Sequence, residues 1–176
     1  MNIKEFDFEL KDTKTPECVI KEYVGKISER TKGMVVCDIL SYNGETESYR
    51  KRNGWFATAE MIEEFGKDIT IDIQNSLGEL GDIDNKYEVF LTVKGLEHYK
   101  YRIMFIRYGA ISYPVTVVLN EDIAEAYSGK SQYEYIVGSM AELEEMLEKI
   151  FDTEYCMSLI QNLIYEALRQ ERKNSQ

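Results

Sequence analysis

The sequence lacks the features that mark a membrane protein, a disulfide-rich secreted protein or a zinc protein. Its longest apolar runs, residues 34–37 and 103–106, have only four residues, whereas a membrane helix needs about 20. Cys18, Cys37 and Cys156 are widely spaced and form no C-x-x-C pair, so we expect buried thiols in a reducing compartment. Residues 1–10 contain no apolar stretch typical of a signal peptide. We therefore expect a cytoplasmic protein that does not enter membranes.

Catalytic motifs are also scarce. The single histidine, His98, lies in a turn-like stretch after a glycine, which favours a solvated side chain over a catalytic base. The sequence has no glycine motif for nucleotides and no G-x-S-x-G, so it indicates neither a phosphate cradle nor a serine nucleophile. Asp82 and Asp84 resemble the start of a calcium loop, but Lys86 and Tyr87 occupy its fifth and sixth positions, where a ligand and a glycine are required. We expect no metal, no cofactor and no enzymatic activity.

The composition is nevertheless that of a folded protein. Apolar residues make up 44% of the 176 residues and aromatic residues 12%, with only two prolines. This length is typical of one domain of about 100–200 residues, and no repeat or linker divides it. We predict one α+β domain over residues 1–176, mainly an antiparallel sheet of about six or seven strands with packed helices. Its C-terminal part, about 139–172, is expected to be a helical pair.

Local patterns place the individual elements. Alternating or β-rich segments predict strands at 6–10, 34–42, 46–50, 69–73, 89–94, 99–108, 113–119 and 133–137. Capping residues and helical spacing predict helices from Thr15 to Gly33, at 58–65 and 120–127, and after Ser139 and Thr153. Asn43-Gly44 predicts a hairpin between 34–42 and 46–50, and residues 74–86 an acidic loop. In the last helix, Met157, Ile160, Ile164 and Leu168 are expected to share one apolar face.

Charge is the most unusual property of the chain. Its formal net charge is −11, from 21 basic and 32 acidic side chains. Residues 61–88 contribute −6 and residues 121–176 contribute −7, whereas residues 89–120 carry +3. Phosphate backbones are bound by cationic side chains, so direct nucleic-acid binding is disfavoured. A basic sheet could still touch nucleic acid that a partner protein holds.

The acidic side chains suggest where a partner protein would bind. In the helix after Ser139, the apolar residues Leu143, Met146, Leu147 and Ile150 would turn inward and leave the acids outside. One interpretation is solubility, because net charge keeps domains dispersed. The other is that spaced carboxylates mimic a phosphate backbone and are attracted to the cationic groove of a nucleic-acid-binding protein. The candidate partner-binding residues are Asp82, Asp84, Glu121, Asp122, Glu144, Glu145, Glu148 and Asp152.

The chain also resembles a class of inhibitor proteins. Three of its segments carry the resemblance: the strand Tyr113–Asn120 with its acidic exit Glu121-Asp122, and the helices Ser139–Ile150 and Thr153–Leu168. In these, the chain is similar to the small acidic anti-CRISPR proteins of phages and mobile elements. The resemblance implies a non-enzymatic protein that blocks the nucleic-acid channel of an RNA-guided CRISPR effector nuclease in the host cytoplasm.

Two alternatives stay open. An immunity protein that neutralises a toxin nuclease would use the same attraction between acids and a cationic groove. A hydrolase could use a pair of the 32 carboxylates. The oligomeric state is also open, because the last helix could offer an apolar face to a second copy.

Overall fold

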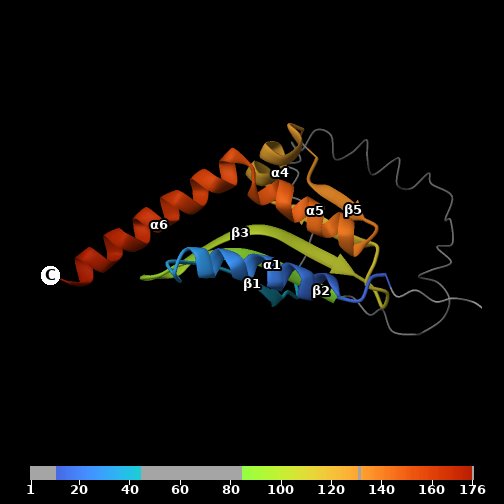
Figure 1. Cartoon of the computed structure of the whole chain (residues 1–176), viewed down its shortest axis with the longest axis horizontal. Coiled ribbons are helices and arrows are strands. Elements are labelled where there is room, and N and C mark those ends of the chain that lie inside the picture. Colours follow the sequence, from blue (N-terminus) through green and yellow to red (C-terminus); the bar gives the residue numbers. More distant parts are fainter. Residues whose placement is uncertain (1–10, 45–84, 131, 176) are drawn as a thin grey trace, which may run out of the picture.

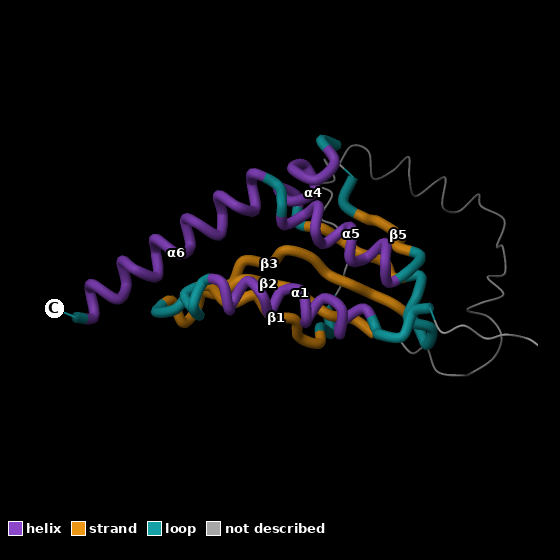
Figure 2. The backbone as a smooth tube through the Cα atoms, viewed as in Figure 1, coloured by secondary structure: helices purple, strands orange, loops and turns teal. Residues whose placement is uncertain are grey.

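One antiparallel sheet with helices packed on it forms the described part of the molecule. The computed structural model describes residues 11–44, 85–130 and 132–175, which form four helices and a five-stranded sheet of order β1-β2-β3-β4-β5 (Figures 1 and 2). The strands are β1 (Val35–Ser41), β2 (Asn85–Val93), β3 (Leu96–Tyr108), β4 (Val115–Leu119) and β5 (Glu134–Val137). The helices are α1 (Pro16–Arg30), α4 (Glu121–Ser128), α5 (Met140–Phe151) and α6 (Glu154–Asn174). The predicted α+β class, antiparallel sheet and C-terminal helical pair are confirmed.

Two strand predictions need correction. The strand β2 begins at Asn85, so residues 85 and 86 of the predicted acidic loop 74–86 belong to a strand, and the rest of that loop lies outside the described residues. His98 is exposed but lies within β3 rather than in a turn. The turn between β2 and β3 is tighter than expected, because Val93 already pairs with Leu96 and only Lys94 and Gly95 remain between them.

The strand β1 pairs with a partner that is distant in sequence. It runs antiparallel to β2, with Val35 opposite Val93 and Ser41 opposite Tyr87. The predicted return strand 46–50 lies outside the described residues, as do the predicted strands 6–10 and 69–73 and the predicted helix 58–65. Of the six or seven strands expected, five belong to the described part of the chain.

Local capping rules explain where the helices begin. Asn120, Ser139 and Thr153 each accept a hydrogen bond from a backbone N–H in the first turn of α4, α5 and α6, respectively, as their sequence positions predict. At α5, the Glu142 carboxylate also accepts from the backbone of Gly138 at 2.8 Å. Because capping is a local property, these starts could be read from a few residues.

One hydrophobic core joins the sheet to the helices. Alternate residues of β1, such as Val35 and Cys37, enter this core together with residues of α1, α4, α5 and α6. In α5 the four predicted apolar residues are all buried. In α6 the buried residues are Cys156, Leu163 and Ala167, and Ile160 and Ile164, of the predicted apolar face, pack partly against the core.

The helix α6 leaves α5 at an angle and crosses to the far end of the sheet (Figure 1). Its C-terminal part is fastened to the β2–β3 turn by an ion pair between Lys94 and Glu171 at 2.9 Å. Gln170 approaches Gly95 so closely that a Cβ atom at this glycine would lie 2.8 Å from its side chain. Because of this course, α1 and α6 lie on the two sides of a surface groove.

Candidate partner-binding surfaces

The helices α4 and α5 and the first turn of α6 carry most of the exposed negative charge of the described chain. Residues 120–154 contain ten acidic and two basic side chains, and all ten acids are exposed. They are Glu121, Asp122, Glu125, Glu134, Glu142, Glu144, Glu145, Glu148, Asp152 and Glu154. We call these residues the acidic surface. It includes six of the eight predicted partner-binding residues, and the other two, Asp82 and Asp84, lie outside the described residues.

Three of the predicted residues lie together around one open depression. Glu145, Glu148 and Asp152 line it with Lys149, facing Tyr127 of α4. Lys149 pairs with Glu145 at 2.5 Å, and this hydrogen bond lowers the pKa of the Glu145 carboxyl. Because the one lysine of the depression is engaged with Glu145, the charges of Glu148 and Asp152 remain available to an incoming cation.

Glu144 points toward the beginning of α1. The pKa of the Lys14 ammonium is raised, chiefly by its hydrogen bond to Glu22 at 2.6 Å and to a smaller extent by the charge of Glu144. Glu144 has no ion pair of its own within the described ranges. It therefore extends the acidic surface toward α1.

Asp122 has a structural role that the sequence did not indicate. Its carboxylate accepts a hydrogen bond from the Tyr155 hydroxyl at 3.1 Å, and that hydroxyl lies 2.9 Å from the Tyr101 hydroxyl. This chain of polar groups joins α4, α6 and β3. Asp122 therefore contributes to holding the acidic surface together, whereas its neighbour Glu121 is exposed in the first turn of α4.

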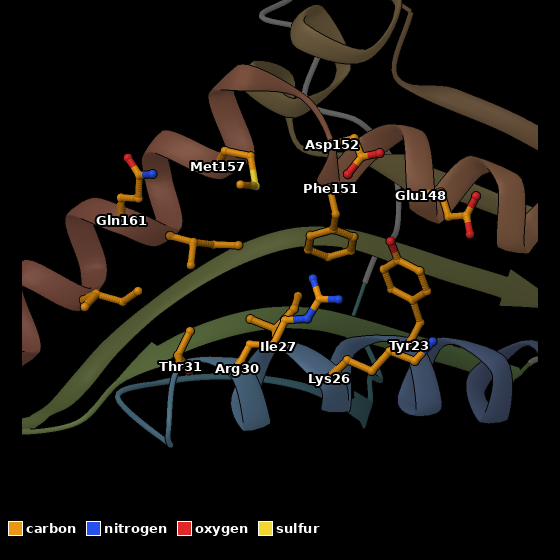
Figure 3. Close-up of a pocket in the computed structure, with 12 residues that line it drawn as sticks. Tyr23, Lys26, Ile27, Arg30, Thr31, Glu148, Phe151, Asp152, Met157 and Gln161 are labelled. Atoms are coloured by element: carbon orange, nitrogen blue, oxygen red, sulfur yellow. The ribbon is translucent and has the colours of Figure 1, made fainter.

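A second surface feature is a groove of about 620 Å³ between α1, α5 and α6. Figure 3 shows Tyr23 and Ile27 on one side, Met157 on the other, and Phe151 between them. The rings of Tyr23 and Phe151 lie 5.6 Å apart. The groove is lined by Tyr23, Lys26, Ile27, Arg30, Thr31, Glu148, Phe151, Asp152, Met157, Ile160, Gln161 and Ile164.

The groove carries charges of opposite sign on its two sides. Lys26 and Arg30 come from α1, whereas Glu148 and Asp152 come from the end of α5 (Figure 3). No ion pair within the described residues joins the two sides. Burial raises the pKa of the Tyr23 hydroxyl, and the charges of Asp152 and Glu148 raise it further. The lining of the groove is thus mainly apolar, and its two edges carry charges of opposite sign.

The sequence contains a signal for this groove. The spacing of Met157, Ile160 and Ile164 predicts one apolar face of α6, and all three residues line the groove. Met157 is 51% exposed, whereas Ile160 and Ile164 also pack partly against the core. The helix has two apolar faces, and the sheet takes the other one. Which face turns inward depends on the angle between α5 and α6, which the local pattern does not specify.

The predicted basic sheet is largely neutralised. Lys100 and Arg102 both bind the buried carboxylate of Glu88, Arg102 at 2.8 Å, and Lys94 binds Glu171. Phe90 packs against Lys100, whose Nζ lies 4.0 Å from the ring centre. These cations are already occupied within the protein, so they are weak candidates for phosphate contacts.

The described residues contain neither a metal-binding cluster nor a membrane-spanning helix. In the described ranges, no three acidic, cysteine or histidine side chains gather as a metal site would require. No described helix has the length and apolarity to cross a bilayer. Comparison with protein-family models, with curated proteins and with solved structures finds no match.

Proposed function

We propose that this protein is a non-enzymatic inhibitor that binds the cationic nucleic-acid groove of a partner protein through its acidic surface. The observation that carries the proposal is the concentration of ten exposed acids against two bases in residues 120–154, which form α4, β5, α5 and the start of α6. Carboxylates on helices keep fixed spacings, and a cationic groove would meet them as it meets a row of phosphates. Nucleic acid would then be excluded by competition.

Electrostatic attraction would set the rate at which such a complex forms. Attraction between patches of opposite sign raises association rates by about 10–10³-fold at low salt, whereas desolvated central contacts set the lifetime of a complex. Tyr127, at the edge of the acidic depression, offers an aromatic group for such a contact. We therefore expect inhibition that weakens with added salt.

The partner that the resemblance favours is an RNA-guided CRISPR effector nuclease. The alternative partner is a toxin nuclease, which would present the same cationic groove. The experiment measures DNA binding and cleavage by purified nucleases of both classes with increasing amounts of this protein. Inhibition of guide-loaded effectors alone supports the first partner, and inhibition of toxin nucleases alone replaces it with the second.

Two matched variants test the surface itself. Glu144→Gln/Glu145→Gln removes two charges from the acidic surface, and Glu29→Gln/Glu97→Gln removes two exposed charges from α1 and β3. Both variants have the same net charge, so their difference reports position. We expect about three- to tenfold weaker inhibition for the first variant only, as for charges at the rim of an interface. Equal inhibition by both variants, or inhibition insensitive to about 0.5 M salt, would contradict the proposal.

A further inference from the structure

The helix α6 presents a second, largely apolar stripe that the described chain covers only in part: Ile164 and Leu168 are half-buried, and the other residues are exposed. The stripe consists of Met157, Gln161, Ile164, Tyr165 and Leu168, at the i, i+4, i+7, i+8 and i+11 positions of one helix face. Met157 is 51% and Tyr165 67% exposed, and the first three residues line the groove. Another face of α6 packs in the core, so the exposed residues of this stripe have no such packing within the described part of the chain.

The two ends of the stripe carry opposite charges. Glu154 lies in the first turn of α6 and Arg172 in the last. They are 18 residues apart, which is about five turns of 3.6 residues, so both lie on the side of the stripe. Both side chains are exposed, and neither forms an ion pair within the part of the chain described here. The stripe is therefore apolar in the middle, negative at one end and positive at the other.

We propose that two copies of this protein form a symmetric dimer in which their α6 helices lie antiparallel along this stripe. A two-fold axis midway between Gln161 and Tyr165 is also midway between Glu154 and Arg172. Each Glu154 then faces Arg172 of the partner subunit. Symmetric interfaces require such a self-complementary surface, and a parallel arrangement would place like charges together.

The groove explains why a second copy fits better than a ligand of one charge. Its two sides carry charges of opposite sign, Lys26 and Arg30 on one and Glu148 and Asp152 on the other, and no ion pair within the described residues joins them. A purely anionic or purely cationic ligand would satisfy one side and be repelled by the other. A copy of α6 brings apolar side chains for the groove, and in the antiparallel arrangement its Arg172, which faces Glu154, also approaches the acidic side of the groove.

Sedimentation equilibrium and light scattering test the dimer from about 1 to 200 µM protein. The wild type should change from 20.5 kDa toward twice that mass as its concentration rises. Glu154→Arg alone places two like-charged pairs across the axis, and so does Arg172→Glu alone. Each variant should dimerise at least about tenfold more weakly.

A mixture of the two charge variants provides the decisive measurement. In a mixed dimer both pairs again combine opposite charges, so the mixture should regain wild-type association. This recovery would also show that the variants fold. Glu29→Arg and Lys32→Glu make the same charge changes at exposed sites near the end of α1. A mixture of these two control variants should associate no more strongly than either variant alone.

Tyr165→Ser tests the apolar part of the contact. Because Tyr165 is largely exposed, its loss should leave the thermal unfolding of the monomer unchanged and weaken dimerisation by about tenfold or more. A wild type that stays monomeric over the whole range would overturn the dimer. So would a mixture that associates no better than its components. Glu148, Asp152 and Glu154 belong to both the acidic surface and the dimer contact. The nuclease assay instead changes Glu144 and Glu145, which lie outside the stripe and the groove, so the two tests can fail independently.

Discussion

At the scale of single residues, Glu88 is the one charged residue of the described chain whose side chain is buried. Its side chain is buried between Lys100 and Arg102. Burial raises the pKa of the Glu88 carboxyl, but the hydrogen bonds and charges of the two cations outweigh burial, so that the pKa lies below its ordinary value. A carboxyl with a lowered pKa in the folded state stabilises the protein at neutral pH, and this contribution is lost as the pH falls through that pKa.

Glu88→Gln should therefore lower the free energy of unfolding at neutral pH. Hydrogen bonds to charged groups contribute about 1.5–3 kcal/mol each at most sites. Solvent screens Lys100 and Arg102, which are 39% and 40% exposed, so we expect a total loss of about 1–2 kcal/mol. Urea unfolding at several pH values between about 7 and 3 measures it.

The pH dependence separates the charge of Glu88 from its shape. The difference in unfolding free energy between wild type and Glu88→Gln should narrow as the pH falls, because the wild-type carboxyl is protonated as the pH passes through its lowered pKa. Glu97→Gln, at an exposed position of β3, should leave the stability unchanged at every pH. A gap that is constant with pH would show that packing rather than charge makes Glu88 important.

At the scale of elements, the helix caps are a direct test of local encoding. The Ser139 and Thr153 side chains accept from the backbone N–H groups of Glu142 at 3.3 Å and Cys156 at 3.2 Å. Ser139→Ala and Thr153→Ala should each cost about 1 kcal/mol of unfolding free energy. Thr15 occupies the same position at α1 but accepts no such bond, so Thr15→Ala should cost clearly less. Equal losses at all three sites, measured by urea unfolding, would remove capping as the cause.

The same elements show what the sequence could and could not predict. Caps and the α5 stripe depend on residues within two turns, so they were predictable. The pairing of β1 with β2 joins segments about 50 residues apart, and no local signal specifies it. The sequence places a turn at Gly95 but makes it too long, because it does not show that Leu96 pairs with Val93 and that the strand therefore includes His98.

The candidate surfaces were also predictable only in part, namely where they depend on a single helix. Exposure of Glu144, Glu145 and Glu148 followed from the stripe of α5, because their positions are opposite its buried residues. The groove did not follow, since it needs α1 and α6, which are more than 120 residues apart, on either side of Phe151. The engagement of Asp122 with Tyr155 depends on the same tertiary arrangement.

At the scale of the whole molecule, the negative charge is a cost to stability as well as a binding feature. A net charge of −11 means repulsion among carboxylates that folding brings closer together. The acidic surface concentrates this repulsion on α4 and α5, since only Lys130 and Lys149 offset its ten acids. The proposed inhibitor thus keeps on its surface a charge pattern that a cationic partner would relieve.

Salt should therefore stabilise the free protein. Raising the ionic strength from about 0.01 M to 0.15 M shortens the screening length from about 30 Å to 8 Å. A relief of about 1 kcal/mol would raise the Tm by about 2–4 °C in a chain of this size. Calorimetry at low protein concentration measures this shift without a contribution from dimers. Glu144→Gln/Glu145→Gln should reduce the shift more than the matched Glu29→Gln/Glu97→Gln, because its charges lie among the other acids. A Tm that falls with salt would mean that attractive ion pairs, such as those of Glu88, outweigh the repulsion.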